Sequence, residues 1–411
     1  MSNLEELIEK LCPDGVEYKT LTELFDTRNG YTPSKSKEEY WTNGTVPWFR
    51  MEDIRENGSI LSKAIQYVSE SAIKGSLFPA NSIIVATSAT IGQHALIRVP
   101  SLANQRFTYL VLKEEFKEQL DIMFIYYCCF KLDEYCKECL NQGNFTSVDM
   151  KKFLKFKFPV PPLEVQREIV RILDNFTFLS AELAAELAAR QKQYEYYKEY
   201  LFENHIFDVE WKRLDELFPF IRNGFVGTIK SFFTNETDGI RYLEGTNIHD
   251  GVISDNEVLY VTKEFHKKHI KNQLKADDIL MVQSGHIGEC AVVGKKYEGS
   301  NCHALIIMSN GGKCLSKYYV YYFHTIKGFK SLTPAITGGT IKHVLAGKVG
   351  KIKVPVPSLE QQQRIVGILD RFDTLCNDIT SGLPAEIEAR QKQYEYYRDK
   401  LLSFKELKKE A

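Results

Sequence analysis

An octapeptide occurs twice in this sequence, and its repetition narrows the choice of folds more than any other feature. RQKQYEYY stands at Arg190–Tyr197 and, unchanged, at Arg390–Tyr397. A related pair precedes it, because Lys155–Glu164 reads KFKFPVPPLE and Lys351–Glu360 reads KIKVPVPSLE. Eight identical residues do not recur by chance in a chain of 411 residues. The chain is therefore one unit built twice.

The repeat also covers the segments before these motifs. Three pairs of segments correspond: Glu17–Phe25 with Glu210–Phe218, Arg28–Tyr31 with Arg222–Phe225, and Ser88–Gly92 with Ser284–Gly288. The last pair follows the apolar runs Ile83–Ala86 and Ile279–Val282, which places a polar turn at the end of a buried strand. We predict a globular α+β domain in each repeat, with a helix near Leu120–Leu140 or Ser316–Lys330.

Each repeat ends in a predicted long helix, which begins after Pro161-Pro162 in the first copy. Apolar residues then recur at alternating steps of four and three, a period of 3.5 residues that is typical of a coiled coil. The seam runs through Ile169, Leu173, Phe176, Ser180, Leu183, Leu187, Arg190, Tyr194, Tyr197 and Leu201, and in the second copy through Ile365, Leu369, Phe372, Cys376, Ile379, Tyr394, Tyr397 and Leu401. A helix over Glu164–Asn204 would be about 60 Å long. Two copies in one chain favour an antiparallel pair about a pseudo-two-fold axis, although each helix could instead pack on its own domain.

The two helices differ in length. Asp370 and Arg390 are separated by four residues more than Asp174 and Arg190, and the added region contains Gly382 and Pro384. Four residues are about one turn, and proline inside a helix removes a hydrogen bond. We predict a break near Ser381–Pro384 and a continuous first helix at Phe178–Leu187.

These features define a fold class and four parts. The fold class is α+β, with two pseudo-two-fold-related globular α/β domains joined by a long antiparallel two-helix coiled coil. The globular domains are expected at residues 1–160 and 206–356, and the long helices at 161–205 and 357–411.

Composition is that of an ordinary soluble protein. The net charge of −1 and the pI of about 6.8 argue only weakly against nucleic-acid binding, because a basic face can be offset by acidic helices. The longest apolar stretches, Met123–Phe130 and Tyr318–Phe323, are too short to cross a membrane, and the N-terminus has no signal-peptide pattern. We expect a cytoplasmic protein that does not associate with membranes.

The cysteines and histidines are expected to serve structural roles. Nine cysteines without an export signal disfavour a disulfide framework. The C-x-x-C of Cys136 and Cys139 falls in a helix-like segment, and not on the turns that a zinc site needs. His266 and His269 lie in the basic segment HKKHIK, which favours a solvated surface over a metal site.

The opening of each long helix carries a family resemblance. The pattern K-x-P-x-P-x-L-E, followed by Gln and then by I-V-x-I-L-D, together with the duplication and the central coil, resembles the specificity subunit of type I restriction-modification enzymes. The resemblance extends from about Glu17 to Leu402. It implies a subunit that reads double-stranded DNA with two target recognition domains, each reading half of a split, asymmetric site. It further implies a coil that acts as spacer and docks methyltransferase subunits, two of them, with restriction subunits joining the complex.

The absence of catalytic motifs agrees with this resemblance. A DNA amino-methyltransferase needs an Asn-Pro-Pro-aromatic tetrapeptide, and the one Pro-Pro here lies in Val160–Leu163. The sequence also lacks a glycine-rich AdoMet loop, a phosphate-binding loop, H-E-x-x-H and a nucleophile elbow. We therefore expect a non-catalytic subunit without cofactor or metal, whose partner flips and modifies the base.

Three polar loops in each domain are candidates for DNA contact, because base edges and phosphates are met by polar side chains on well-held loops. We name them loops A, B and C: Ser88–Gln93, Asn104–Arg106 and Gln142–Ser147 in the first domain, and Gln283–His286, Asn301–His303 and Thr337–His343 in the second. The candidate residues are Arg50, Ser88, Thr90, Gln93, Asn104, Gln105, Arg106, Asn144, Thr146 and Ser147, then Gln283, Ser284, His286, Asn301, His303, Thr337, Thr340, Lys342 and His343. The loops differ between the copies, which predicts an asymmetric target.

Each candidate residue also has a simpler interpretation. Its polar side chain can stabilise the turn in which it lies without contacting DNA. The lysines that follow loop C, at 151–157 and 348–353, can contact phosphates or protect a strand edge. A second class of function is an interaction scaffold, with two ligand-binding modules on a coil and no DNA. Salt dependence separates the two classes, since binding through phosphates weakens steeply with salt.

Overall fold

The structure, a computed structural model, describes residues 2–141, 146–203, 209–339 and 342–407. It divides into two compact units. The first comprises the residues up to Glu182 together with those from Ile387, and the second comprises Leu183–Glu386. Each unit contains one globular domain and parts of the long helices.

The first globular domain is a mixed α+β structure. Its strands are β1 (Glu17–Thr20), β2 (Phe25–Asn29), β3 (Val46–Phe49), β4 (Ile60–Leu61), β5 (Tyr67–Val68), β6 (Ser82–Ala86), β7 (His94–Ile97), β8 (Leu102–Ala103), β9 (Phe107–Leu112), β10 (Leu140–Asn141), β11 (Ser147–Val148) and β12 (Lys157–Val160). Its helices are α1 (Ser2–Leu11), α2 (Leu21–Leu24), α3 (Met51–Asn57), α4 (Ile122–Glu138) and α5 (Met150–Phe153). The strands form sheets of order β2-β9-β6-β7-β4 and β5-β3-β8, with the pairs β1-β12 and β10-β11.

The second globular domain repeats this plan. Its strands are β13 (Glu210–Arg213), β14 (Phe220–Asn223), β15 (Phe233–Thr234), β16 (Gly239–Leu243), β17 (Ile248–His249), β18 (Val252–Ile253), β19 (Leu259–Thr262), β20 (Ile279–Val282), β21 (Cys290–Val292), β22 (Asn301–Cys302), β23 (Leu305–Ser309), β24 (Ile336–Thr337), β25 (His343–Val344) and β26 (Lys353–Val356). Its helices are α7 (Leu214–Leu217), α8 (Lys263–Lys268), α9 (Ser316–Phe323), α10 (Ile326–Ser331) and α11 (Ala346–Val349). The larger sheets have the orders β14-β23-β20-β21 and β15-β19-β16-β22.

The two domains share strand register as well as strand order. The central strand β6 pairs antiparallel with β9 and β7, and β20 pairs likewise with β23 and β21. The strand ends also match, because Ala86 pairs with Phe107 and Val282 pairs with Leu305. The sheet β5-β3-β8 corresponds to β19-β16-β22, each with one antiparallel and one parallel pair. The α+β domains predicted from the repeat are confirmed.

The predicted helix near Leu120–Leu140 is confirmed as α4. It begins where the Asp121 carboxylate accepts hydrogen bonds from the backbone N–H groups of Met123 (2.8 Å) and Phe124 (3.4 Å). Cys128, Cys129 and Cys136 lie on its buried side, as expected for helix residues. In the second domain the same region is two helices, because α9 ends before His324 and the hydroxyl of Thr325 caps α10 by accepting from the Gly328 N–H (2.9 Å).

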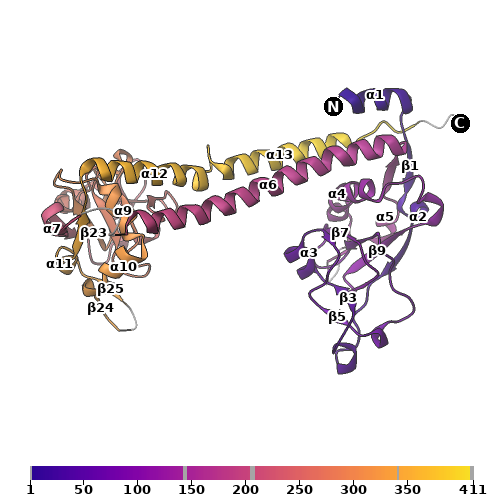
Figure 1. Ribbon diagram of the computed structural model, residues 1–411, viewed down its shortest axis with the longest axis horizontal. Coiled ribbons are helices and arrows are strands. Elements are labelled where there is room, and N and C mark those ends of the chain that lie inside the picture. Colours follow the sequence, from indigo (N-terminus) through magenta and orange to yellow (C-terminus); the bar gives the residue numbers. More distant parts are fainter. Residues whose placement is uncertain (1, 142–145, 204–208, 340–341, 408–411) are drawn as a thin grey trace. The chain divides into compact units, whose positions relative to one another are not determined.

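The first long helix, α6 (Leu163–Leu201), is continuous over 39 residues. The second is divided into α12 (Leu359–Asn377) and α13 (Leu383–Leu401), as Figure 1 shows. The predicted break is confirmed, and Pro384 is the second residue of α13, where its missing N–H costs no helical hydrogen bond. Between the helices, the Asp378 carboxylate accepts hydrogen bonds from the backbone and hydroxyl of Thr380 and from the hydroxyl of Ser381.

The long helices pair within each unit. In the first unit the ring of Phe176 lies 6.4 Å from that of Tyr394 and 5.6 Å from that of Tyr397. In the second unit Phe372 lies 6.0 Å from Tyr194 and 5.6 Å from Tyr197. Residue numbers rise along α6 while they fall along its partners, so the pairing is antiparallel as predicted.

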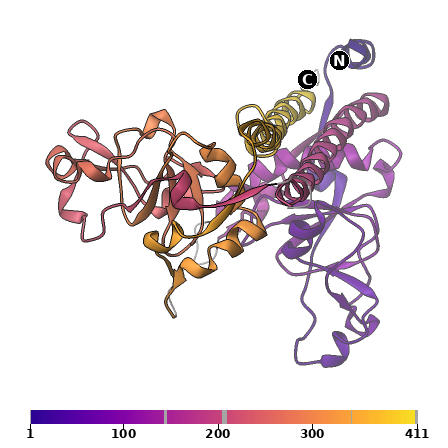
Figure 2. The same cartoon turned by 60° about the vertical axis from the view of Figure 1, so that its left-hand side comes forward.

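The segment that follows α13 contacts the first domain. Val16 forms a parallel β-bridge with Glu406, and the Tyr18 hydroxyl donates to the carbonyl of Phe404 (3.1 Å). Both Figure 1 and Figure 2 show α1 close to the end of α13. The segment after α13 therefore completes the sheet edge at which the first domain begins.

Candidate nucleic-acid interface

Loops A, B and C of the first domain meet at the end of β6. The N–H of Thr87 donates to the carbonyl of Arg106 in loop B (3.0 Å), and the carbonyl of Thr87 accepts from the N–H of Val148 after loop C (2.9 Å). Ser88 in loop A and Ser147 in loop C form an antiparallel bridge. The backbone hydrogen bonds of Thr87 therefore hold the three predicted loops together on one surface.

Most candidate side chains on this surface are accessible. Gln93, Gln105, Arg106 and Thr146 are exposed, and Ser88, Thr90, Asn104 and Ser147 are half-buried. The Asn104 side-chain oxygen accepts from the Arg106 N–H (3.0 Å), which fixes the shape of loop B. Gln105 accepts a hydrogen bond from the hydroxyl of Thr32. Asn144 lies outside the described residues.

Arg50 stands beside loop B. It follows Phe49, whose carbonyl accepts from the N–H of Asn104 (3.0 Å). The guanidinium group lies 5.7 Å from the ring of Trp48, and its Nε is 4.0 Å from Glu52. That Nε is buried and finds no hydrogen-bond partner among the described residues. The corresponding residue of the second domain is Glu244, so the two domains carry opposite charges at this position.

The second domain brings its loops together in the same way. The carbonyl of Gln283 accepts from the N–H of Val344 (2.9 Å), and Ser284 forms an antiparallel bridge with His343. Loop B precedes β23, the strand that pairs with β20 up to Val282. The exposed candidates are Ser284, His286, Lys342 and His343, and the half-buried ones are Gln283, His303 and Thr337; Thr340 lies outside the described residues.

Asn301 differs from the other candidates because it is buried. Only 1% of its surface is exposed. Its side-chain oxygen lies 2.6 Å from Nδ1 of His266, and its amide nitrogen donates to the carbonyl of His269 (3.4 Å). In this structure the amide holds loop B to the segment after β19 and does not face solvent.

Loop A has the same backbone shape in both domains. Ala89 and Gly285 adopt left-handed conformations with φ of 64° and 80°, and Gly92 and Gly288 do so with φ of 77° and 87°. Glycine is needed at Gly92, where a Cβ would lie 2.7 Å from the backbone oxygen of Asp133. A common framework therefore carries different side chains at its tip.

A polar pair lies behind loop A in each domain, buried in the first domain and half-buried in the second. In the first, His94 Nδ1 is 2.6 Å from the Asp133 carboxylate. In the second, Cys290 occupies the place of His94, and His324 approaches from the helix side to within 3.5 Å of Glu289. The hydrogen bond with His324 holds the pKa of Glu289 below its ordinary value. Both pairs tie the strand after loop A to the neighbouring helix.

The hairpin β17–β18 is a further segment beside loop A of the second domain, and the sequence patterns did not predict it. The ring of His249 lies 6.4 Å from that of His286, and the N–H of Asp250 donates to Glu289 (3.1 Å). His249 and Glu289 also line a cavity of about 1190 Å³ together with residues of α6 and α12. The repeat motifs found in the sequence do not include this segment, so they carried no signal for the hairpin.

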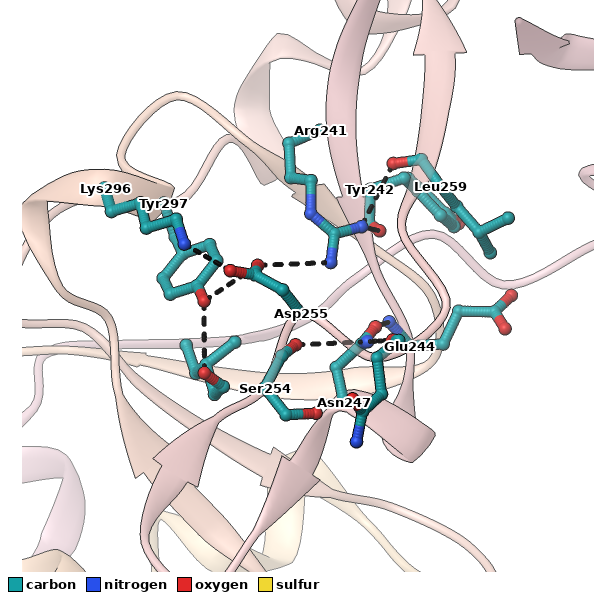
Figure 3. Close-up of polar contacts among 11 residues, drawn as sticks. Arg241, Tyr242, Glu244, Asn247, Ser254, Asp255, Leu259, Lys296 and Tyr297 are labelled. Carbon is teal, nitrogen blue, oxygen red and sulfur yellow. Dashed lines mark hydrogen bonds and ion pairs between the residues drawn. The ribbon is translucent and has the colours of Figure 1, made fainter. Parts of the chain in front are cut away.

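A polar network braces this hairpin. Figure 3 shows Asp255 between Lys296 and Arg241, with the Tyr297 hydroxyl donating to Asp255 (3.0 Å) and to the carbonyl of Ile253 (3.1 Å). The hydrogen bond from Lys296 lowers the pKa of the Asp255 carboxyl. The buried amide of Asn247 donates to the carbonyls of Ser254 (3.3 Å) and Asn256 (2.6 Å). The hairpin is thus fixed by side chains that are not themselves on the candidate surface.

Membrane spans and metal clusters are both absent from the described residues. No helix among residues 2–141, 146–203, 209–339 and 342–407 is long and apolar enough to cross a membrane. Within the same residues no group of three or more His, Cys, Asp and Glu side chains is arranged to hold a metal ion.

Comparison with known proteins identifies the fold and its class. The family model of the type I restriction modification DNA specificity domain matches twice, at residues 13–189 and 207–389. The chain therefore belongs to this family of DNA specificity proteins.

Similar proteins support a narrower statement. The specificity subunit of the type I restriction enzyme EcoprrI of Escherichia coli is 39% identical over 408 residues, covering 92% of this chain and 93% of the relative. The EcoR124I/EcoR124II specificity subunit of E. coli is 36% identical over 276 residues, covering 64% and 67%. This chain is a specificity subunit of a type I restriction-modification system.

Solved structures share the fold at low sequence identity. A chain from a study of assembly and conformational transition in the type I restriction-modification system aligns with a TM-score of 0.66 at 17% identity, covering 95% of this chain and 98% of that one. The HsdS subunit from Thermoanaerobacter tengcongensis aligns with a TM-score of 0.56 at 15% identity, covering 95% and 97%. The predicted family and fold class are confirmed.

Proposed function

We propose that the chain reads a two-part, asymmetric DNA target, with one half-site for each globular domain. The observation that carries this proposal is the convergence of loops A, B and C at the end of one central strand in both domains. The backbone framework is common, but the exposed side chains are Gln93, Gln105 and Arg106 in one domain and His286, Lys342 and His343 in the other. A shared framework with different donors and acceptors suits two different base sequences.

The long helices provide the spacer in this proposal. The recognition domains are residues 1–160 and 206–356, and the helical segments are 161–205 and 357–411. The continuity of α6 over 39 residues supports this role.

The octapeptide repeat supports docking of two methyltransferase subunits. Tyr196 and Tyr396 hold the same position in the two identical copies, and they are 61% and 63% exposed. Residues kept identical in both copies and exposed in both fit two identical partners, because each partner then meets the same surface. Restriction subunits join this complex, which works in the cytoplasm.

The chain itself performs no chemistry in this proposal. The candidate surface offers hydroxyls, amides, imidazoles and a guanidinium group, which suit hydrogen bonding to base edges and phosphates. The partner methyltransferase binds its own cofactor and modifies the base.

The test is to map methylated sequences in cells that express the chain with its methyltransferase subunit. We expect one two-part sequence, with Arg106→Ala changing the preference in one half and His343→Ala in the other, each by about 1–3 kcal/mol per lost base contact. The control, Arg167→Ala, removes an exposed charge on α6 and should leave both halves unchanged. Absence of sequence-specific methylation, or equal shifts in both halves, would refute the proposal in favour of a scaffold.

A further inference from the structure

The segment after β19 carries four lysines that no described contact explains. Lys263, Lys267, Lys268 and Lys271 are exposed, and Glu264 is the one acidic residue among them. We call Lys263–Lys271 the basic segment; it comprises α8 and the start of the 3-10 helix Ile270–Asn272. In the part of the chain that the structure describes, none of the four lysines forms an ion pair, so their charges are available to a partner.

The other face of the basic segment is anchored. Phe265 is buried, and its ring lies 4.4 Å from the ring of His269, which in turn lies 4.9 Å from Phe225. Nδ1 of His266 contacts the side chain of Asn301 at 2.6 Å. The two histidines are therefore used to hold the segment, and the lysines between and around them point away from the core.

The anchor point is loop B of the second domain. Asn301 is the first residue of that loop, and its amide bonds on one side to His266 and on the other to the carbonyl of His269. Phe225, against which His269 packs, forms a parallel bridge with His303 of the same loop. The basic segment is thus attached directly to one of the loops proposed to read DNA.

The first domain shows that the fold does not require this segment. The strand β5 corresponds to β19, and it is followed by the 3-10 helix Glu70–Ala72 in place of α8. That turn reads ESA and contains an acidic residue and no lysine. The basic segment is therefore an addition to the second domain. A surface that only faces solvent would not need the contacts that anchor this segment to loop B.

We propose that the basic segment contacts the phosphate backbone of duplex DNA beside the second half-site. The proposal rests on the proposed function, because it needs loop B to approach the bases. Phosphates flank every base edge that a groove-reading loop can reach, and lysine ammonium groups neutralise them without regard to sequence. The segment would strengthen and orient binding by the second domain and add nothing to sequence preference.

The experiment compares two double variants of the full chain assembled with its methyltransferase subunit. Lys267→Gln/Lys268→Gln removes two charges from the basic segment. Lys295→Gln/Lys313→Gln removes two exposed lysines of the same domain outside it, so both variants have the same net charge. Binding is measured over a range of salt concentrations to a duplex that contains the mapped target and to a duplex of the same length and random sequence.

We expect the slope of log K against log salt to become shallower by about 1–2 for the first variant, since each lost phosphate contact removes about 0.9. The change should be equal on both duplexes, and the methylated sequence should not change. The control variant should keep the slope of the unmodified complex.

The inference is overturned if the slope of the first variant is unchanged, or if the control variant shows an equal change. The proposed function still stands in that case, provided that the unmodified complex binds its target specifically. Loss of methyltransferase assembly in the first variant also overturns it, because the lysines would then serve a protein partner. If the unmodified complex shows no target preference, the proposed function itself fails.

Discussion

Gln166 and Gln362 explain why the motif at the start of each long helix contains glutamine. Both are buried. Gln166 accepts from the N–H of Asp121 (2.8 Å) and donates to the carbonyl of Pro161 (2.7 Å). Gln362 accepts from the N–H of Leu315 (2.8 Å) and donates to the carbonyl of Pro357 (2.9 Å). Each amide thus joins the long helix, the preceding strand and the start of the domain helix. A buried amide with its partners satisfied is costly to remove.

The aspartate of the same motif works in the same way. The Tyr127 hydroxyl donates to Asp174, and the Tyr321 hydroxyl donates to Asp370, both at 2.6 Å. The pKa of each tyrosine is raised, mainly by burial and further by this carboxylate, so both hydroxyls stay protonated as donors. One glutamine and one aspartate in each repeat therefore attach a globular domain to its helix.

Replacing Gln362 tests this attachment. We expect Gln362→Leu to lower the free energy of unfolding by about 1–3 kcal/mol, because the N–H of Leu315 loses its buried acceptor. The neighbouring Gln363 is exposed, and Gln363→Leu should change stability by less than about 0.5 kcal/mol. Urea unfolding of the two variants measures the difference. Equal stabilities would show that the buried amide contributes nothing to the junction.

Helices and strands were largely predictable from the sequence, because their signals are local. Proline marked the start of α6, and Gly382 with Pro384 marked the break. The 3.5-residue period marked the seam except at Ile379, where it was wrong, because Ile379 lies between α12 and α13 and is 75% exposed. Loop A was placed correctly at a strand end in both domains, since Ile83–Ala86 and Ile279–Val282 are buried strands. Loop B of the second domain was predicted less well, because Asn301 and Cys302 form the strand β22.

Long-range contacts were not predictable. The partners of Asn301 lie more than 30 residues earlier in the chain, in a basic segment whose pattern suggested only a solvated surface. The hairpin β17–β18 lies outside the repeat motifs found in the sequence, and its bracing by Asp255 and Lys296 joins residues 41 positions apart. Such contacts depend on the tertiary fold, which spacing along the sequence does not encode.

The aromatic seam of the long helices gives a prediction about their pairing. Phe176 is half-buried against Tyr394 and Tyr397, whereas Phe178, on the same helix, is 62% exposed. Phe176→Ala should destabilise the first unit by roughly 2 kcal/mol, since a half-buried ring loses less than the roughly 3–5 kcal/mol of a fully buried one.

Phe178→Ala is the matched control for that change. Its stability should match the unmodified chain, while its binding to the methyltransferase subunit should weaken if the exposed face of α6 is a docking surface. Thermal unfolding and a pull-down of the two subunits separate these effects. A destabilised Phe178→Ala with a normal Phe176→Ala would contradict the orientation of the seam.

In the whole molecule, the proposed spacing of the half-sites depends on the long helices, and the two copies differ there by four residues. The additional residues fall at the break between α12 and α13, where Asp378 holds Thr380 and Ser381. The first copy lacks them, and α6 is continuous at the same place. The break is therefore an insertion of about one helical turn that leaves the seam nearly in phase on either side.

Deletion of Asp378–Ser381 should affect the spacer and leave the half-site bases unchanged. Four residues of helix measure about 6 Å, which is close to two base-pair steps of about 3.4 Å. We expect the accepted spacer to shorten by about one or two base pairs, or binding to be lost, while the bases of both half-sites stay the same, because loops A, B and C are untouched. Replacing the same four residues by alanines keeps the length and should leave the spacer unchanged. Methylation mapping of both variants decides the matter: altered half-site bases with an unaltered spacer would show that the long helices do not set the distance between the half-sites.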